Sequence, residues 1–364
     1  MLVSLNAPPS PDSSGQPRRR RPRYAGKHPR RFAEKYKEHD PQRFAETVEK
    51  VIASGKTPAG THRPIMVAEV LEALAPRPGE LVADCTLGYG GHARELLARI
   101  LPGGHLCGLD ADPVELPKTE ARLRALGFGE DVFTAHRSNF AGLPQVLAEY
   151  LSRSASAGDT PVVPAADVIL ADLGVSSMQL DDPTRGFSVK FAGPLDMRMN
   201  PGRGQPAARL LQNLSPGELA EMLQENADET RATELAAALA GKDFATTTEL
   251  AGAIRVLFPK LAKEEVGLTT RRVFQALRIT VNDEFNALDN FLRVLPQCLK
   301  PGGRVAILTF HSGEDRRVKK SFEAGLRAGA YAAISHDVIR PGHEERNSNP
   351  RSAPAKLRWA RRAN

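Results

Sequence analysis

Short apolar runs alternate with segments of helical periodicity from residue 61 onward, and this alternation limits the fold more than any other feature of the chain. Short apolar runs bounded by turn residues are typical of buried strands, whereas apolar residues recurring every three or four positions are typical of amphipathic helices. Strands and helices that alternate with short turns favour a parallel, doubly wound α/β sheet of the Rossmann-like type. We predict strands at 81–86, 105–110, 132–136, 168–172 and 305–310, helices at 62–74, 92–100, 113–126 and 283–299, and a turn at 299–303.

A second region, residues 201–280, contains no convincing strand pattern and interrupts this alternation. Helical spacing with capping residues at the start occurs at 215–224, 229–240 and 247–257. A helical module is therefore predicted to be inserted into the sheet domain. The predicted parts are a largely disordered basic arm with one short amphipathic helix at 1–60, a sheet domain at 61–180 and 281–364, and an all-helical substrate-recognition domain at 181–280.

The net charge of +7 is concentrated at the two ends of the chain. Residues 1–60 carry 13 Lys/Arg against 6 Asp/Glu, and residues 340–364 carry 7 against 2, so the region between them is mildly acidic. Basic ends around an acidic body are typical of a protein whose ends contact the phosphates of a nucleic acid. The alternative, that both ends are solvated tails, stays open.

The cysteines and the hydropathy of the chain indicate the cellular compartment in which we expect the protein. Cys85, Cys107 and Cys298 are isolated thiols without a CxxC pair, which argues against a disulfide scaffold or a metal site and fits a reducing cytoplasm. No apolar run approaches the roughly 20 residues of a membrane span, and the N-terminus lacks the apolar core of a secretory signal. We therefore expect a cytoplasmic protein with no metal and no membrane partner.

The turn after the first predicted strand reads Asp84-Cys-Thr-Leu-Gly-Tyr-Gly-Gly-His92, and Asp110 ends the next strand. Glycines let backbone amides approach a ligand at a helix N-terminus, and an acid at the tip of the second strand accepts hydrogen bonds from both ribose hydroxyls. Together they predict a nucleoside cofactor, with a purely structural turn as the alternative.

The same turn favours S-adenosylmethionine over a dinucleotide. A dinucleotide fingerprint has a third glycine for close helix packing around a pyrophosphate, and the turn here has none at that spacing. S-adenosylmethionine has instead a carboxylate, an amine and a sulfonium. Asp84 and Asp172 suit its cationic end, and the amides of Gly90, Gly91 and His92 suit its carboxylate. A nicotinamide-dependent oxidoreductase is the rival enzyme class.

Residues 172–199 are a dense run of polar and turn-forming residues directly after a buried strand. No amphipathic helix or alternating strand needs such a run, so we predict a substrate-facing loop. With it, the chain resembles the ribosomal RNA small subunit methyltransferase H family from about residue 61 to 362. The motifs that carry this resemblance are GYGGH, GLDADP, SNF, DLGVSSMQLDDPTRGFSVKFAGPLDMRM, TTRRVFQALRITVNDE, LKPGGRVAILTFHSGEDRRVK and NPRSAPAKLR.

The resemblance implies a class I methyltransferase sheet with an inserted helical domain. It also implies methylation of the exocyclic amine of a decoding-centre cytidine in 16S rRNA, with S-adenosylmethionine as donor. Met178 and Gly313 depart from the family pattern, which usually has Pro and Leu there. Carried over by position, the implied donor contacts come from Gly90, Gly91, His92, Asp110, Phe140, Asp172 and Gln179.

The chemistry of the methyl acceptor, an exocyclic amine, points to further candidate residues for catalysis and RNA binding. An exocyclic amine is a weak nucleophile because its lone pair is delocalised into the ring, so the site must orient it and accept its hydrogens. The catalytic candidates are Asp172, Asp196 and His311, and the RNA-binding candidates are Arg198, Arg271, Arg272, Arg278, Arg351 and Lys356. A structural role for His311 and loop-internal ion pairs of Asp182, Arg185 and Arg198 stay open as alternatives.

The expected partner is 16S rRNA within the small ribosomal subunit, and a homodimer is a further expectation. A non-catalytic rRNA-binding assembly protein is the rival to an enzyme. Loss of Asp110 or of the 172–199 block would have favoured it, and both are intact.

Overall fold

The computed structural model describes residues 64–154, 164–190 and 192–364. The predicted basic arm and its helix lie outside the described residues. No helix in the described ranges is long and apolar enough to cross a membrane.

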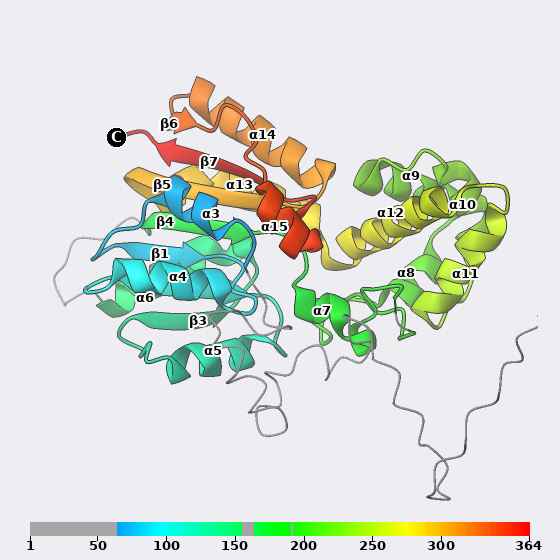
Figure 1. The fold of residues 1–364 in the computed structure, drawn as a ribbon, viewed down its shortest axis with the longest axis horizontal. Helices are drawn as coiled ribbons and strands as arrows, with labels where there is room; N and C mark the ends of the chain where they lie inside the picture. Colours follow the sequence, from blue (N-terminus) through cyan, green and yellow to red (C-terminus); the bar gives the residue numbers. More distant parts are fainter. Residues whose placement is uncertain (1–63, 155–163, 191) are drawn as a thin grey trace, which may run out of the picture. The chain divides into compact units, whose positions relative to one another are not determined.

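The described residues form a seven-stranded sheet in the order β3-β2-β1-β4-β5-β7-β6 (Figure 1). The first five strands pair in parallel, as predicted. Two further strands were not predicted, and they make the sheet mixed because β7 runs antiparallel to both β5 and β6. The strands are β1 (Leu81–Asp84), β2 (His105–Asp110), β3 (Phe133–Arg137), β4 (Ala166–Asp172), β5 (Leu299–Thr309), β6 (Tyr331–Ile334) and β7 (Lys356–Arg362).

Alternation along the strands covers both faces of the sheet with helices. In β4, Ile169 and Ala171 belong to one buried cluster, whereas Val168 and Leu170 belong to another on the opposite face. Successive side chains of a strand point to opposite faces, so a strand buried on both sides is continuously apolar. One face packs against α6 (Leu143–Ser154), α13 (Glu284–Cys298) and α14 (Ser312–Arg327), and the other against α3 (Val67–Leu74), α4 (Gly91–Ile100) and α5 (Leu116–Ala125).

A separate buried cluster belongs to the helices between β4 and α13. Capping boxes at Ser215 and Thr246 start two of these helices, each with Glu three residues on. The contacts between residues, however, place all described residues in one compact unit. The division into a sheet domain and an inserted domain is therefore a proposal, which the separate core supports. The helices are α8 (Ala207–Asn213), α9 (Pro216–Ala227), α10 (Ala232–Leu239), α11 (Thr247–Leu257) and α12 (Lys263–Asn282).

One helix was not predicted individually, and two predictions about local structure were wrong. The long helix α12 was not predicted, because Gly267 and two adjacent threonines weaken its helical pattern. The turn expected at 299–303 is part of β5, which starts before the two glycines. Residues 172–199 are not only loop, because they contain α7 (Ser177–Asp181) and a 3₁₀ turn at Pro183–Arg185.

Candidate active site

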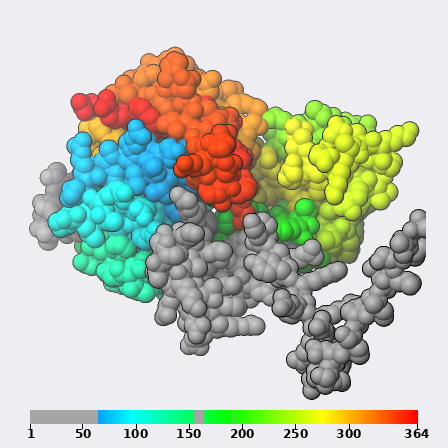
Figure 2. Space-filling model, in the orientation of Figure 1, coloured from blue at the N-terminus to red at the C-terminus, as the bar shows by residue number. Residues whose placement is uncertain are grey.

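A cavity of about 1720 Å³ opens at the carboxyl ends of β1, β2, β4 and β5. The chain runs outward from β1 to β3 on one side and returns to β4 on the other, which is the switch point where open α/β sheets bind ligands. Residues of α12 and α13 line the far side of the cavity. The C-terminal segment borders the cavity through Pro350, Arg351, Ala353 and Pro354. Just before these residues, α15 (His343–Ser348) lies against the start of the sheet domain (Figure 2), where Glu345 accepts a hydrogen bond from the Met66 amide at 2.9 Å.

The β1 turn places backbone amides at the start of α4. Gly90 caps this helix with a φ of +81°, and a Cβ there would lie 3.0 Å from Thr119 Cγ2, so the position requires glycine. The Thr119 hydroxyl donates to the carbonyl of Gly88 and holds the turn against α5. Gly91 and His92 line the cavity from the first turn of α4.

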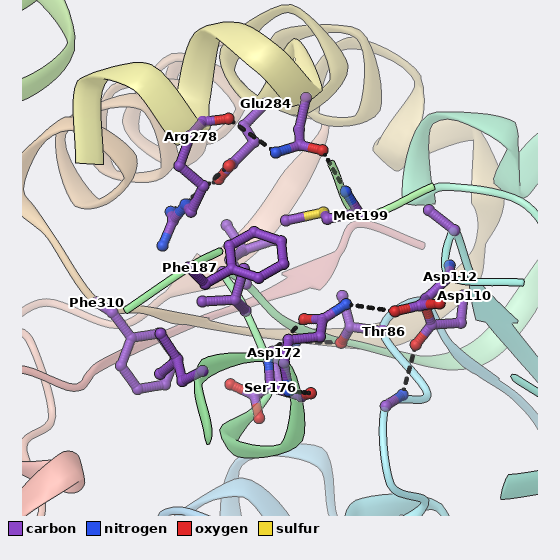
Figure 3. Close-up of a pocket in the computed structure, with 18 of the residues that line it drawn as sticks. Thr86, Asp110, Asp112, Asp172, Ser176, Phe187, Met199, Arg278, Glu284 and Phe310 are labelled. Carbon is purple, nitrogen blue, oxygen red and sulfur yellow. Dashed lines mark hydrogen bonds and ion pairs between the residues drawn. The ribbon is translucent and has the colours of Figure 1, made fainter. Parts of the chain in front are cut away.

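Asp110 ties the β1 turn to the loop after β2 (Figure 3). Its Oδ2 accepts a hydrogen bond from the Gly88 amide at 2.7 Å, and its Oδ1 accepts one from the Asp112 amide at 2.8 Å. Burial raises the pKa of Asp110 to about 6, although these two amides oppose the shift. The carboxylate lines the cavity and keeps lone pairs for a ligand.

Among the described carboxylates at this edge of the sheet, Asp172 has the most strongly raised pKa. Its amide donates to Thr86 Oγ1 at 2.6 Å, and its Oδ2 lies 3.6 Å from His92 Nε2. Its Oδ1 is buried without a hydrogen-bond partner among the described residues. Burial, and then repulsion from Asp84 and Glu314, raises the pKa of Asp172 to about 8. A cation placed in the cavity would relieve this cost by favouring the ionised form.

Asp84 lies behind this carboxylate, at the end of β1, and is 1% exposed. Burial raises its pKa to about 7, opposed by a hydrogen bond from the Thr86 amide. It does not line the cavity, so the predicted direct contact of Asp84 with a cationic ligand is not supported.

His311 faces the cavity next to Glu314, just after β5 ends. Its Nε2 lies 3.1 Å from Glu314 Oε1, and Glu314 Oε2 accepts a hydrogen bond from the Phe310 amide at 2.8 Å. Burial opposes ionisation of Glu314, but His311, Arg278 and the Phe310 amide outweigh it and lower its pKa. Arg278 in turn makes two hydrogen bonds of 2.8 Å to Glu284.

Two predicted donor contacts have other partners. Phe140 lines the cavity with its ring edge-on to Phe291 at 5.6 Å. Gln179 uses both ends of its amide, because Oε1 accepts from the Ser176 amide and Nε2 donates to Asp112 Oδ2. Its direct contact with a donor stays a prediction.

The structure brings most candidates to the cavity and leaves others outside it. Arg271, Arg278 and Arg351 line it, whereas Arg272 contacts Glu229 at 3.8 Å and Lys356 contacts Asp315 at 3.0 Å. Asp196 also lies outside, in a two-bond ion pair with Arg198 that lowers its pKa against the effect of burial. The lining residues that sequence reasoning missed include Thr86, Asp112, Phe187, Met199, Arg203 and Glu314.

Sheet order, the antiparallel β7 and a ligand cavity at the switch point define a class I methyltransferase fold. The family model of the MraW methylase family matches residues 59–363. The chain belongs to this family.

Individual relatives agree. The chain is 49% identical over 354 residues to the ribosomal RNA small subunit methyltransferase H 1 of Lachnoclostridium phytofermentans, covering 95% of this chain and 93% of that protein. It is 39% identical to the ribosomal RNA small subunit methyltransferase H of Crocosphaera subtropica, covering 84% and 90%. A solved SAM-dependent O-methyltransferase from Thermotoga maritima aligns at a TM-score of 0.37 and 9% identity, over 87% of this chain and 71% of that one, which is too low to add to the assignment.

Proposed function

We propose that this chain transfers a methyl group from S-adenosylmethionine to the exocyclic amine of a decoding-centre cytidine in 16S rRNA. Family membership and relatives named for small-subunit rRNA methylation support the reaction class. The observation that carries the proposal is the position of Asp172, whose Oδ1 is buried without a hydrogen-bond partner among the described residues and which lines a cavity of about 1720 Å³. A methylase family also favours the methyl donor over the nicotinamide alternative.

The residues present fit this donor. Backbone amides at the start of α4 suit its carboxylate, Asp110 suits the ribose, and the orphaned Oδ1 of Asp172 suits its cationic end. Phe140 offers an apolar face for the adenine. When bound, S-adenosylmethionine supplies a methyl group made electrophilic by the sulfonium.

The acceptor side of the cavity provides what a weak amine nucleophile needs. Phe187, Met199 and Phe310 line it and can hold a planar base out of water (Figure 3). Asp172 then orients the amine and accepts a hydrogen bond from it, and His311 beside Glu314 is the second candidate for its proton. A paired or stacked cytidine must be flipped out to reach this depth.

The direct test is nucleoside mass spectrometry of 16S rRNA incubated with the protein and methyl-labelled S-adenosylmethionine. We expect label in N4-methylcytidine alone, and label in another nucleoside or none would overturn the proposal. Free 16S rRNA and small subunits from a strain lacking the protein are assayed side by side, because we propose the assembled subunit in the cytoplasm as substrate. Light scattering of the pure protein tests the proposed homodimer.

Asp110→Asn is expected to weaken donor binding about 10- to 150-fold, because hydrogen bonds to a charged carboxylate contribute about 1.5–3 kcal/mol. Isothermal titration calorimetry with S-adenosylmethionine measures the change. Asp167→Asn is the matched control, because Asp167 also accepts a backbone amide, that of Leu81 at 2.8 Å, but lies outside the cavity near the amino end of β4. Equal affinity losses in the two variants would contradict a ribose contact.

Arg271 is expected to contribute to the salt dependence of RNA binding. In the described part of the chain it has no ion-pair partner, and it is exposed at the rim of the cavity. Neutralising one phosphate of single-stranded RNA adds about −0.7 to the slope of log K against log salt, so Arg271→Gln should make the slope shallower by about 0.7. Exposed Arg327 on α14 is the control, and Arg327→Gln should leave the slope unchanged.

A further inference from the structure

Asp112 is a buried carboxylate whose lone pairs are all used within the protein. It is 1% exposed and follows Asp110, whose side chain accepts the Asp112 amide at 2.8 Å. Its Oδ1 accepts backbone amides at the start of the next segment, from Val114 at 2.8 Å and from Glu115 at 3.3 Å. Its Oδ2 accepts from Gln179 Nε2 and from the Arg185 guanidinium, both at 2.8 Å, so Asp112 joins the donor loop to a distant part of the chain.

Arg185 uses the rest of its guanidinium on the acceptor side. Its Nη2 donates to the carbonyls of Arg198 at 3.1 Å and Met199 at 2.9 Å, and its side chain is only 10% exposed. The turn that aims it is enforced by Gly186, which has a φ of +73° and where a Cβ would lie 2.1 Å from the carbonyl oxygen of Pro194. Sequence reasoning had left an ion pair inside the loop open for Arg185, and the structure instead pairs it with Asp112, outside that loop.

The path continues into the helical region. The Met199 amide donates to Asn282 Oδ1 at 2.7 Å (Figure 3), and Asn282 Nδ2 donates to the Met197 carbonyl at 2.8 Å and to the Arg278 carbonyl at 2.9 Å. Asn282 ends α12, and Met199 lines the cavity. A continuous chain of hydrogen bonds therefore runs from the donor-side Asp110 to the helix that lines the acceptor side.

We propose that Arg185 is a positioning residue for methyl transfer, which fixes the donor side of the cavity relative to the acceptor side through Asp112 and the Met199 carbonyl. The inference rests on the proposed function. A planar guanidinium can hold a carboxylate and two carbonyls at once in fixed directions, which a single ammonium cannot do. Methyl transfer needs donor and amine aligned at about 3–3.5 Å, and a misplacement of about 1 Å can cost roughly 10²-fold in rate.

The test variant is Arg185→Lys, which keeps the charge beside Asp112 and loses the fork. Arg304→Lys is the matched control, because Arg304 likewise joins a carboxylate, that of Glu80, to the carbonyls of Leu74 and Ala75. Arg304 lies outside the cavity and its side chain is 16% exposed. Its replacement should therefore affect the stability of the fold to a similar degree without affecting the site.

We expect both variants to lose similar thermal stability, while only Arg185→Lys loses kcat, by at least about tenfold, with KM for the donor changed less than about threefold. A kcat of Arg185→Lys within twofold of wild type would overturn the proposal. An equal loss of kcat in Arg304→Lys would overturn it as well, because the effect would then follow stability alone.

A binding experiment separates this inference from the proposed function, because it needs no turnover. Affinity of a 16S rRNA fragment containing the target cytidine is measured with and without saturating S-adenosylhomocysteine. Wild type is expected to bind the fragment more tightly with this ligand, and the ratio should fall toward one in Arg185→Lys. A wild-type ratio of one overturns the positioning role. If the wild-type protein binds the RNA fragment more tightly with S-adenosylhomocysteine but transfers no methyl group, only the proposed function is overturned.

Discussion

Asp172→Asn is expected to abolish methyl transfer, by at least about 10²-fold in kcat, and at the same time to stabilise the unliganded protein at pH 8. In the proposed reaction this carboxylate borders both donor and acceptor, and a neutral amide cannot stabilise the positive charge that develops on the acceptor amine. In the free protein, however, burial and the neighbouring Asp84 and Glu314 raise its pKa to about 8. A neutral amide of the same shape removes the cost of ionising this position.

The sign of the stability change follows from the two pKa values of Asp172. Below the unfolded value of 3.8 both states are protonated and the substitution should have little effect. Between 3.8 and about 8 the unfolded chain is ionised and the folded one is not, so wild type loses stability as pH rises and the variant does not. Thermal melts from pH 4 to pH 9 should therefore show the gain of Asp172→Asn growing with pH.

Asp196→Asn provides a control of opposite sign. Arg198 lowers the pKa of Asp196 despite partial burial, so this carboxylate stabilises the fold above its unfolded pKa. Its replacement should lower the melting temperature at pH 8 while leaving donor affinity unchanged. The account of Asp172 is wrong if Asp172→Asn melts below wild type at pH 8, or if it methylates at a rate within about threefold of wild type.

The second large effect is release of protons when the donor binds near neutral pH. With a pKa of about 8 in the free protein, Asp172 is mostly protonated at pH 7, and a cationic ligand beside it favours the carboxylate. Binding should therefore expel a fraction of a proton approaching one, and affinity for S-adenosylmethionine should rise with pH up to about 8. Calorimetry at pH 7 in buffers of different ionisation enthalpy measures the proton count.

Two comparisons locate this proton. S-adenosylhomocysteine lacks the sulfonium charge, so its binding should release fewer protons. Asp172→Asn should remove most of the release, leaving the share of Asp84, whose pKa is raised to about 7, and of Asp110, at about 6. Enthalpies that do not depend on the buffer, or a release that survives in Asp172→Asn, would assign the effect to another group.

The sequence allowed the five parallel strands to be predicted because all of them except the edge strand β3 are largely buried, and continuous apolar runs such as that of β4 are visible without tertiary information. In β7, KLRWARR, charged residues alternate with apolar ones, so no strand was predicted there, although the segment was assigned to the sheet domain. It becomes a central strand only through pairing with β5 and β6.

Within the site, residues at the ends of predicted strands could be predicted, whereas contacts between residues far apart in the sequence could not. Asp110 and Asp172 end predicted strands and were found from position alone. The contact of Asp112 with Arg185 spans 73 residues, and that of Met199 with Asn282 spans 83, so neither leaves a local pattern. Asp196 was chosen as a catalytic candidate because it is a carboxylate in this loop, yet both of its oxygens accept hydrogen bonds from Arg198. Residue spacing does not specify the side-chain directions on which this ion pair depends.

The paired burial of Asp84 and Asp172 has a consequence for how long the protein survives in a cell. A ligand that binds only the folded state stabilises it by mass action, and here the donor would also offset the cost of ionising Asp172 beside Asp84. The unliganded protein should unfold locally more often and be degraded sooner than the donor-bound form. Its abundance is therefore expected to follow the supply of methyl donor, which would let starvation for that donor reduce the enzyme itself and not only its turnover.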